Sequence, residues 1–590
     1  MQGLEKLEYR GYDSAGVTLA DENGLVTIKA KGRLSELDRI LEGRELKQRT
    51  GIGHTRWATH GVPNNLNAHP HTNSSNTISL VHNGIIENYV SLKQMLENNG
   101  YTFQSETDSE AVVHLIDYYF CRYKDMEKAF KRAVKDLEGS YALCVISTYE
   151  ADTIFVAKKE SPMILGADEE GTFCASDAPA LLKYTRKLVS LSDGDIAVLR
   201  PDSISVYDNR DEKKDIEWME FPYDIQSAQK GGYDTFMEKE IHEQPYTIRE
   251  TLRGRFSGDS VRLSELDVIR DELRNIKQVM WIACGTAYHA CVYAQMIFNR
   301  LVPVNSIAIP ASEFRYGNYH VDRNTLCVFV SQSGETADTL AAIKLAKTSG
   351  AVTVAIVNAL GSSLTRIADT TLYTCAGLEI AVASTKAYTA QLVLLFLLAE
   401  KLSEFMGYSV NEHKEMIDEL KDLDEITEKV INSSRDTVRE YASMLKNEHD
   451  VYFIGRQLDY VSAMEGALKL KEISYIHADA YYAGELKHGP IALIQEGTVV
   501  VALATQKEVS GKTISNIKET VSRGARVILI TDGETNTEGF TYVIRLPKIH
   551  EGLMCVTAAV ILQLLAYYAA VLRGCDVDKP RNLAKSVTVE

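Results

Sequence analysis

The sequence has few cysteines, and none of them forms a paired motif. The nine cysteines are odd in number and scattered, with no CxxC pair, which argues against a zinc ribbon or a redox motif. Free thiols in a reducing cytosol are the simple explanation, so we expect a cytoplasmic protein. Residues 1–20 are charged and contain no apolar core segment, so no signal peptide is visible.

Positive charge and long hydrophobic runs are also scarce. With a net charge of −17, general binding of nucleic acid or of an anionic membrane is not expected, although a local site for an anionic substrate remains possible. Only residues 554–572 are apolar over a length that could span a bilayer. That run contains Thr557, Gln563, Tyr567 and Tyr568, and we predict a buried helix rather than a membrane span.

The length of 590 residues is too great for one hydrophobic core and suggests about three or four domains. Residues 1–204 combine short strands with a few helices, which predicts an α+β domain with a mostly antiparallel sheet. Residues 205–266 are polar and charged, and we interpret them as a linker that ends in a helix near Thr235.

The rest of the chain alternates continuous apolar strands with helices, which is typical of buried parallel sheets. The strands recur in two sets, so we predict two copies of a doubly wound α/β domain at 267–407 and 441–580, followed by a tail at 581–590. Ligands of such domains bind at the carboxyl ends of the strands.

A candidate acid–base site lies within residues 462–490. Glu465, Lys469 and Glu472 share one face of a predicted helix, and the following turn presents His488. Carboxylates, a lysine and a histidine beside an apolar helix suit proton transfer. The structural alternative is a surface Glu465–Lys469 pair followed by an ordinary polar loop.

Ser331 opens the motif SQSGET, residues 331–336, between a buried strand and a helix. Hydroxyls and free backbone N–H groups at a helix N-terminus bind phosphate well, so the motif predicts a phosphate site, against the alternative of a Ser-rich helix cap. No GK[ST] follows, which excludes a Walker loop. Thr286 follows another strand of the same domain, and the stretch 382–386 could add hydroxyls and a cation.

The first domain carries polar residues that together describe an amino-acid site. Arg56 suits a carboxylate ligand, Asn83 and Gly84 could stabilise an oxyanion, and Asp108 could hold an amino group. Singly, a surface arginine, a hairpin turn and a helix cap are the favoured explanations. No serine or cysteine is obviously placed for attack.

The C-terminal tail contains one lysine of interest. Lys585 could reach a carbonyl and form a Schiff base, whereas a disordered tail is the default interpretation of such a terminus.

Taken together, these residues resemble the glutamine–fructose-6-phosphate aminotransferase (isomerising) family, also called glucosamine-6-phosphate synthase, over nearly the whole chain. The motifs that carry the resemblance are YRGYDSAG (9–16), GHTRWATHG (53–61), VHNGIIEN (81–88), SQSGET (331–336), EGALKLKE (465–472), GELKHGP (484–490) and LAKSVTVE (583–590).

The resemblance implies an N-terminal-nucleophile glutaminase, an αββα sandwich truncated at its start, followed by two sugar-isomerase (SIS) domains. Glutamine would be held by Arg56, Thr59, His60, Gly84 and Asp108, with Asn83 and Gly84 as the oxyanion hole and Trp57 as the gate of an ammonia channel. The sugar phosphate would be held by Thr286, Ser331, Gln332, Ser333 and Thr336, with Val382 and Ser384 nearby.

The same resemblance assigns the chemistry on fructose 6-phosphate. His488 would open the sugar ring, Lys585 would form the imine, and Glu472 would carry a proton between C1 and C2. Members of the family are cytoplasmic dimers in which such a histidine comes from the partner subunit, and no metal or organic cofactor is implied.

One departure concerns the nucleophile. The family's mature chain begins with a cysteine that attacks glutamine, whereas no cysteine precedes Cys121 here. We expect a fragment of a normal enzyme rather than a glutaminase-dead form, with glutamine hydrolysis lost in the chain as given. The alternatives to full activity are an isomerase that uses free ammonia or does not aminate, and a non-enzymatic sugar-phosphate sensor, which would not need Glu472, His488 and Lys585 together.

Overall fold

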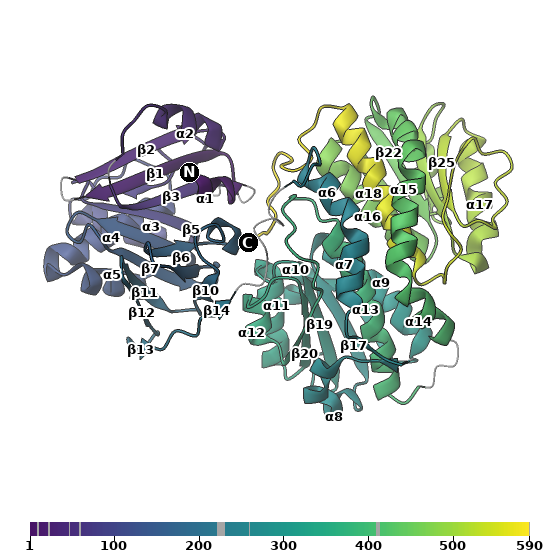
Figure 1. Ribbon diagram of the computed structural model, residues 1–590, viewed down its shortest axis with the longest axis horizontal. Coiled ribbons are helices and arrows are strands. Elements are labelled where there is room, and N and C mark those ends of the chain that lie inside the picture. The colour runs from purple at the N-terminus through teal and green to yellow at the C-terminus, as the bar shows by residue number, and fades with distance from the viewer. Residues whose placement is uncertain are drawn as a thin grey trace. The chain divides into compact units, whose positions relative to one another are not determined.

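The computed structural model describes residues 1–8, 11–21, 24–46, 48–57, 61–220, 230–258, 260–408 and 413–588. The chain forms two compact units (Figure 1), one of Met1–Ala228 with Ser586–Glu590 and one of Gln229–Lys585.

The first unit is an αββα sandwich, as predicted from the family resemblance. A three-stranded antiparallel sheet has the order β2-β1-β3, and a seven-stranded sheet has the order β13-β12-β11-β7-β6-β5-β4. The strands of the two sheets are β1 Ser14–Asp21, β2 Gly24–Lys31, β3 Thr50–Arg56, β4 His71–Thr72, β5 Ile78–Ile86, β6 Gly139–Ser147, β7 Ile154–Lys159, β11 Ile196–Arg200, β12 Ser203–Tyr207 and β13 Lys213–Lys214. A smaller sheet, β14-β10-β8-β9, consists of β8 Ile164–Ala167, β9 Thr172–Ala175, β10 Lys187–Ser190 and β14 Met219–Glu220.

Alternation of side chains along the strands creates these layers. In β1, Ala15 packs with Leu37 of helix α2 (Leu34–Leu41), whereas Ala20 packs with Val81 and Cys144 of the larger sheet. The other face of the larger sheet is covered by α3 (Tyr89–Asn98), α4 (Asp108–Tyr123) and α5 (Met126–Lys135). Successive side chains of a strand point to opposite faces, so one strand serves two cores.

Asn83 and Gly84 lie inside β5, so the expected hairpin turn at these residues is wrong. Asn83 pairs with Ala142 of β6. Gly84 has a φ of +124°, and an added Cβ would lie 2.1 Å from the Ser140 carbonyl oxygen. Glycine is therefore required there both by the backbone conformation and by the close approach of β6.

The second unit contains two five-stranded, wholly parallel sheets with the same strand order, β18-β17-β19-β20-β21 and β23-β22-β24-β25-β26. The prediction of two doubly wound copies is confirmed. The strands are β17 Gln278–Ala283, β18 Asn305–Pro310, β19 Thr325–Ser331, β20 Val352–Val357 and β21 Thr370–Tyr373 in the first copy, and β22 Asp450–Gly455, β23 His477–Tyr482, β24 Val499–Ala504, β25 Arg526–Thr531 and β26 Tyr542–Arg545 in the second.

Helices cover both faces of these sheets. The first copy contributes α9 Gly285–Leu301, α10 Ala311–Tyr316, α11 Ala337–Thr348, α12 Ser363–Ile367 and α13 Lys386–Phe405. The second contributes α16 Leu458–Ser474, α17 Lys507–Val521 and α18 Met554–Leu572. Along the chain, α14 His413–Lys421 and α15 Leu423–Ala442 come between the two copies. The predicted apolar run is α18, which packs against α15 and α16 and is 89% buried, so the expectation of a buried core helix is confirmed.

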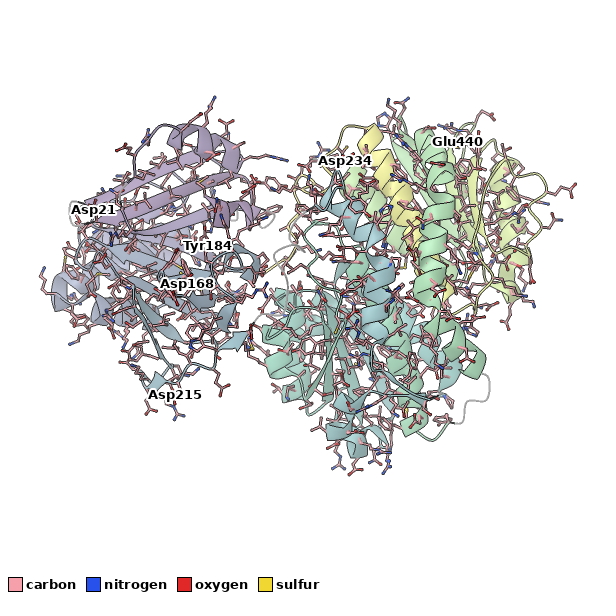
Figure 2. All side chains as sticks on the ribbon, viewed as in Figure 1. Asp21, Asp168, Tyr184, Asp215, Asp234 and Glu440 are labelled. Atoms are coloured by element: carbon pink, nitrogen blue, oxygen red, sulfur yellow. The ribbon has the colours of Figure 1, made fainter. Side chains whose placement is uncertain are left out.

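The predicted linker 205–266 contains two packed helices, α6 (Phe236–His242) and α7 (Gln244–Leu252). Met237 and Ile241 of α6 belong to the core around α18, and Ile248 of α7 belongs to the core around α13. Figure 2 shows Asp234, just before α6, on the second unit, whereas Asp215 lies on the first. Only part of the polar stretch therefore runs outside a core.

Helices α16 and α18 approach closely at Gly466. A Cβ added there would lie 2.9 Å from Leu562 Cδ2 and 3.0 Å from Phe453 Cε1. Gly511 of α17 is also helical, but an added Cβ would meet nothing within 4 Å. The two glycines thus differ in packing and not in secondary structure.

We expect Gly466→Ala to lower the free energy of unfolding of the second unit by ~1–3 kcal/mol, because the extra methyl group must displace Leu562 or Phe453. Gly511→Ala is the matched control and should raise it by up to ~1 kcal/mol, since alanine has the higher helix propensity. Chemical denaturation followed by circular dichroism measures both. Equal effects of the two substitutions would contradict the packing argument.

Candidate active site

Helix α16 buries the charged side chains that the sequence places on one face. Lys469 Nζ lies 3.2 Å from Glu465 Oε1 and 2.8 Å from Glu472 Oε2. The side chains of Lys469 and Glu465 are each 1% exposed, and that of Glu472 is 20% exposed. The alternative of a surface ion pair is therefore wrong. Only Glu472 of the three can be reached from outside.

The first copy of the α/β domain completes this cluster through α9. Thr286 Oγ1 donates to Glu465 Oε1 at 3.2 Å and accepts from Lys469 Nζ at 3.2 Å. His289 Nδ1 lies 2.8 Å from Glu465 Oε2. Burial favours the uncharged forms of Lys469 and Glu465, but the attraction between their opposite charges is the larger effect. The pKa of Lys469 is therefore raised and that of Glu465 is lowered. His289 was not found from the sequence, because its partner lies 176 residues away.

The loop after β19 is closed by hydrogen bonds to its own serine hydroxyls. The N–H of Gly334 donates to Ser331 Oγ at 3.0 Å, and Ser331 Oγ lies 3.4 Å from Thr336 Oγ1. The N–H of Glu335 donates to Ser333 Oγ at 3.2 Å. Helix α11 begins directly afterwards, as predicted. Gly334 has a φ of +66°, and an added Cβ would lie 2.1 Å from Ser362 Oγ, so glycine is needed to form this turn.

The equivalent loop of the second copy is filled from within. Asp459, in the first turn of α16, accepts hydrogen bonds from the N–H and hydroxyl of Thr505 and from the N–H of Gln506, which follow β24. In the first copy, the equivalent positions are those that follow β19. Burial raises the pKa of Asp459 to about 6. A carboxylate of the chain itself thus lies at this strand end.

The segment before α13 holds the lysine of the C-terminal tail. Lys585 Nζ donates to Glu379 Oε2 at 2.5 Å and to the Ala381 carbonyl at 2.8 Å, and its side chain is 6% exposed. Ser384 Oγ donates to the same Glu379 oxygen at 3.1 Å. The N–H of Val382 donates to the Asp578 carbonyl at 3.0 Å, which ties the segment to the tail. Lys585 is thus held in place, and the alternative of a disordered tail does not apply to it.

His488 lies on a short 3₁₀ helix, Leu486–His488, and its side chain is exposed. Among the described residues, no hydrogen bond or ion pair links His488 to Glu472 or Lys585. The structure therefore joins Thr286 and Glu472 through Lys469, and the hydrogen bonds and ion pairs of the described residues include none from His488 to this cluster.

In the first unit, the predicted glutamine residues come from the ends and interior of neighbouring strands. Arg56 ends β3 and is buried, and one of its guanidinium nitrogens, Nη2, donates to the Gly61 carbonyl at 3.2 Å. Asp108, at the start of α4, accepts from the N–H of Ile86 at 2.8 Å. The ring of Trp57 lies edge-on to Tyr12, with centroids 6.1 Å apart. Thr59 and His60 lie outside the described residues.

Asn83 is contacted by the half-buried His54, which packs on the buried His69, and neither histidine was identified from the sequence. His54 Nε2 lies 2.8 Å from Asn83 Oδ1, and the His54 ring stacks on His69. Burial lowers the pKa of His54 to about 4, so the ring is neutral at pH 7. If Nε2 carries its proton, the ring donates to Oδ1 and fixes the side-chain amide, leaving the Asn83 NH₂ group to point elsewhere.

Comparison with known proteins identifies the parts of the chain. The family model described as "SIS domain" matches residues 272–401 and 444–573, and the model described as "Glutamine amidotransferase domain" matches residues 54–183. These matches fall on the two parallel sheets of the second unit and on the sandwich of the first.

Solved structures show the same fold in the second unit. The C-terminal domain of glucosamine-fructose-6-phosphate aminotransferase from Francisella tularensis is 35% identical with a TM-score of 0.57, over 59% of this chain and 99% of that one. Tagatose-6-phosphate ketose/aldose isomerase from Escherichia coli is 17% identical with a TM-score of 0.50, over 60% of this chain and 96% of that one, and this likeness concerns the fold alone.

Curated relatives extend the similarity to the full length. Glutamine–fructose-6-phosphate aminotransferase (isomerizing) of Clostridium acetobutylicum is 47% identical over 100% of this chain and 97% of its own length. The protein of the same name from Thermococcus kodakarensis is 45% identical over the same shares. With both kinds of domain present in family order, the chain belongs to the glutamine–fructose-6-phosphate aminotransferase (isomerizing) family.

Proposed function

We propose that this chain converts D-fructose 6-phosphate to D-glucosamine 6-phosphate, with nitrogen from L-glutamine in the family's reaction and from free ammonia where glutamine is not hydrolysed. The observation that carries the proposal is the placement of Lys585. Although it lies in an irregular tail, its ammonium group is buried beside Ser384, on the segment that leads into α13. A lysine that is held in a dry site is suited to attack a carbonyl.

The phosphate of the sugar binds at the loop after β19 in this proposal. Ser331, Ser333 and Thr336 place hydroxyls at the N-terminus of α11, where the helix dipole favours an anion. Gln332, Thr286, Val382 and Ser384 line the remainder of the sugar site. Thr286 also contacts Lys469 of α16, which supports a sugar site that includes this helix.

The chemistry follows from these positions. His488 opens the sugar ring, and Lys585 attacks C2 of the open-chain ketose and forms an imine with loss of water. Ammonia then replaces the lysine on C2, and Glu472 moves a proton from C1 to C2, which leaves an aldehyde at C1 and an amine at C2. The ion pair with Lys469 holds the Glu472 carboxylate in place beside the sugar site.

The first unit binds glutamine in this proposal. Arg56 pairs with the α-carboxylate, Asp108 with the α-amino group, and Asn83 with Gly84 stabilises the oxyanion. Thr59 and His60 complete the glutamine site, and Trp57 gates the passage of ammonia. The His54–Asn83 hydrogen bond supports this assignment, because an oxyanion donor must be held in a fixed orientation.

The protein works as a cytoplasmic homodimer with a shared active site in this proposal. The exposure of His488 supports a shared site, since a ring-opening residue that does not reach the site of its own subunit can serve that of the partner.

We expect this protein to form glucosamine 6-phosphate from fructose 6-phosphate and ammonium, because the isomerase chemistry resides in the second unit. Lys585→Ala should reduce product formation by at least ~10³-fold, since no other amine replaces the covalent step. Product is quantified by mass spectrometry. Lys548→Ala, at an ion pair whose lysine is 67% exposed, is the control and should be unaffected.

In a parallel reaction, glutamine replaces ammonium, and the release of glutamate is measured. Isomerisation without amine incorporation would replace the aminotransferase proposal by a sugar-phosphate isomerase, and binding without turnover would favour a sensor.

Mixed dimers test the shared site. Lys585→Ala and His488→Ala should each be inactive, but after mixing and subunit exchange about a quarter of the sites should regain both residues, one from each subunit. Activity of the mixture near that fraction of wild type supports the proposal. Activity no greater than that of the separate variants shows that both residues act within one chain.

A further inference from the structure

Two buried carboxyl groups, Glu379 and Glu240, lie around Lys585. Glu379 has a side chain that is 0% exposed. Its Oε1 accepts hydrogen bonds from the N–H groups of Thr385 at 2.9 Å and Ala387 at 3.0 Å. Its Oε2 accepts from Lys585 Nζ and Ser384 Oγ. The carboxylate is thus fully engaged and directly contacts the lysine.

Glu240 of α6 lies behind the same segment. It is 2% exposed, and its Oε1 accepts hydrogen bonds from the N–H groups of Ile380 and Ala381 at 2.5 and 3.2 Å. The Ala381 carbonyl is the second acceptor of Lys585. Glu240 therefore fixes the peptide that holds the lysine, while its Oε2 is buried without a hydrogen-bond partner.

The surroundings shift the pKa values of the two carboxyl groups in opposite directions. Burial, followed by repulsion from Glu379, raises the pKa of Glu240 to about 8. Burial acts on Glu379 in the same sense, but Lys585 and the hydrogen bonds of the segment lower its pKa. The other cation that acts on Glu240 is Lys386, which is paired with Glu243 at 2.8 Å. At neutral pH, these shifts favour a carboxylate at Glu379 and a carboxylic acid at Glu240.

We propose that Glu379 is a catalytic residue that exchanges a proton with Lys585 during imine formation, and that Glu240 is a positioning residue that holds the 379–381 segment through the N–H groups of Ile380 and Ala381. The imine step rests on the proposed function, whereas the pairing of Glu379 with Lys585 can be measured without a sugar.

Imine formation at Lys585 moves a proton through Glu379 and releases one water. The Lys585 ammonium gives a proton to Glu379 Oε2, and the resulting amine forms a C–N bond to C2 of the open-chain ketose. The nitrogen proton passes to the former carbonyl oxygen and gives the carbinolamine. Glu379 then protonates that hydroxyl, water leaves, and a protonated imine remains with Glu379 again a carboxylate. Burial makes this exchange accessible, because it removes the solvation that stabilises separate charges in water.

Two glutamine substitutions separate the roles. Glu379→Gln removes the carboxylate but keeps the shape. Glu240→Gln mimics an uncharged acid and keeps the acceptor for Ile380 and Ala381. We expect borohydride trapping of the Lys585 imine with fructose 6-phosphate to slow by ~100-fold or more in Glu379→Gln, since proton transfer is lost. The rate of trapping in Glu240→Gln should stay within ~3-fold of wild type at pH 7, because the glutamine oxygen still accepts the hydrogen bonds from Ile380 and Ala381.

A measurement without sugar isolates the lysine. Acetylation of Lys585 by acetic anhydride, followed by peptide mass spectrometry across pH, reports its protonation. Loss of the opposite charge in Glu379→Gln should shift the labelling curve to lower pH, so that labelling at neutral pH rises although trapping falls. A merely structural role would not give these opposite changes, and an unshifted curve overturns the proposal. If Glu379→Gln fails to fold, Glu379→Asp should keep the wild-type labelling curve and trap faster than Glu379→Ala.

The state of Glu240 has its own signature in stability. A folded-state pKa raised from 4.5 to about 8 contributes stability that is fully present below pH 4.5 and is lost as the pH rises toward 8. Wild type should therefore lose stability relative to Glu240→Gln over this interval, as measured by denaturation at each pH. A constant difference overturns the uncharged state of Glu240. If wild type itself traps no imine while the labelling shift holds, the proposed function fails and the Glu379–Lys585 pairing stands.

Discussion

Buried cations need a partner, and this requirement shapes the second unit. Lys469 is almost fully enclosed, and its charge is tolerable only because Glu465 and Glu472 stand beside it. Removing one partner of such a pair typically costs about 3–5 kcal/mol, because the other charge remains buried and unpaired. Since Thr286 and His289 belong to the other copy of the α/β domain, satisfying these charges also fixes how the two copies meet.

Lys585 shows the same requirement in an irregular segment. The tail has no helix or strand to fix it, yet Glu379 and the Ala381 carbonyl hold its ammonium group. The order of the tail at this point comes from electrostatics and hydrogen bonds rather than from apolar packing. A group held in this way can be released by proton transfer alone, without unfolding of the surrounding structure.

Local patterns predicted much of this molecule. Apolar strands followed by polar turns gave the two parallel sheets, and the i, i+4, i+7 spacing in α16 placed three charged residues on one face. Contacts between distant segments were beyond such patterns. Glu240 and Glu379 are 139 positions apart, and nothing in the spacing of either links it to Lys585. The prediction of a turn at Asn83–Gly84 was wrong for a related reason. An Asn-Gly pair is typical of a turn, but here the close approach of β6 requires the glycine within a strand.

The carboxylate of Asp459 gives the repeated architecture an asymmetry. Both copies end their third strand in a loop whose N–H and hydroxyl groups favour a negative charge, but in the second copy an aspartate of the chain takes up those donors permanently. An anionic ligand would have to displace a covalently tethered competitor, whose effective concentration no free metabolite matches. In the described part of the second copy, the donors that follow β24 are therefore used within the chain itself, and this copy contributes the charged face of α16 to the cluster with Thr286.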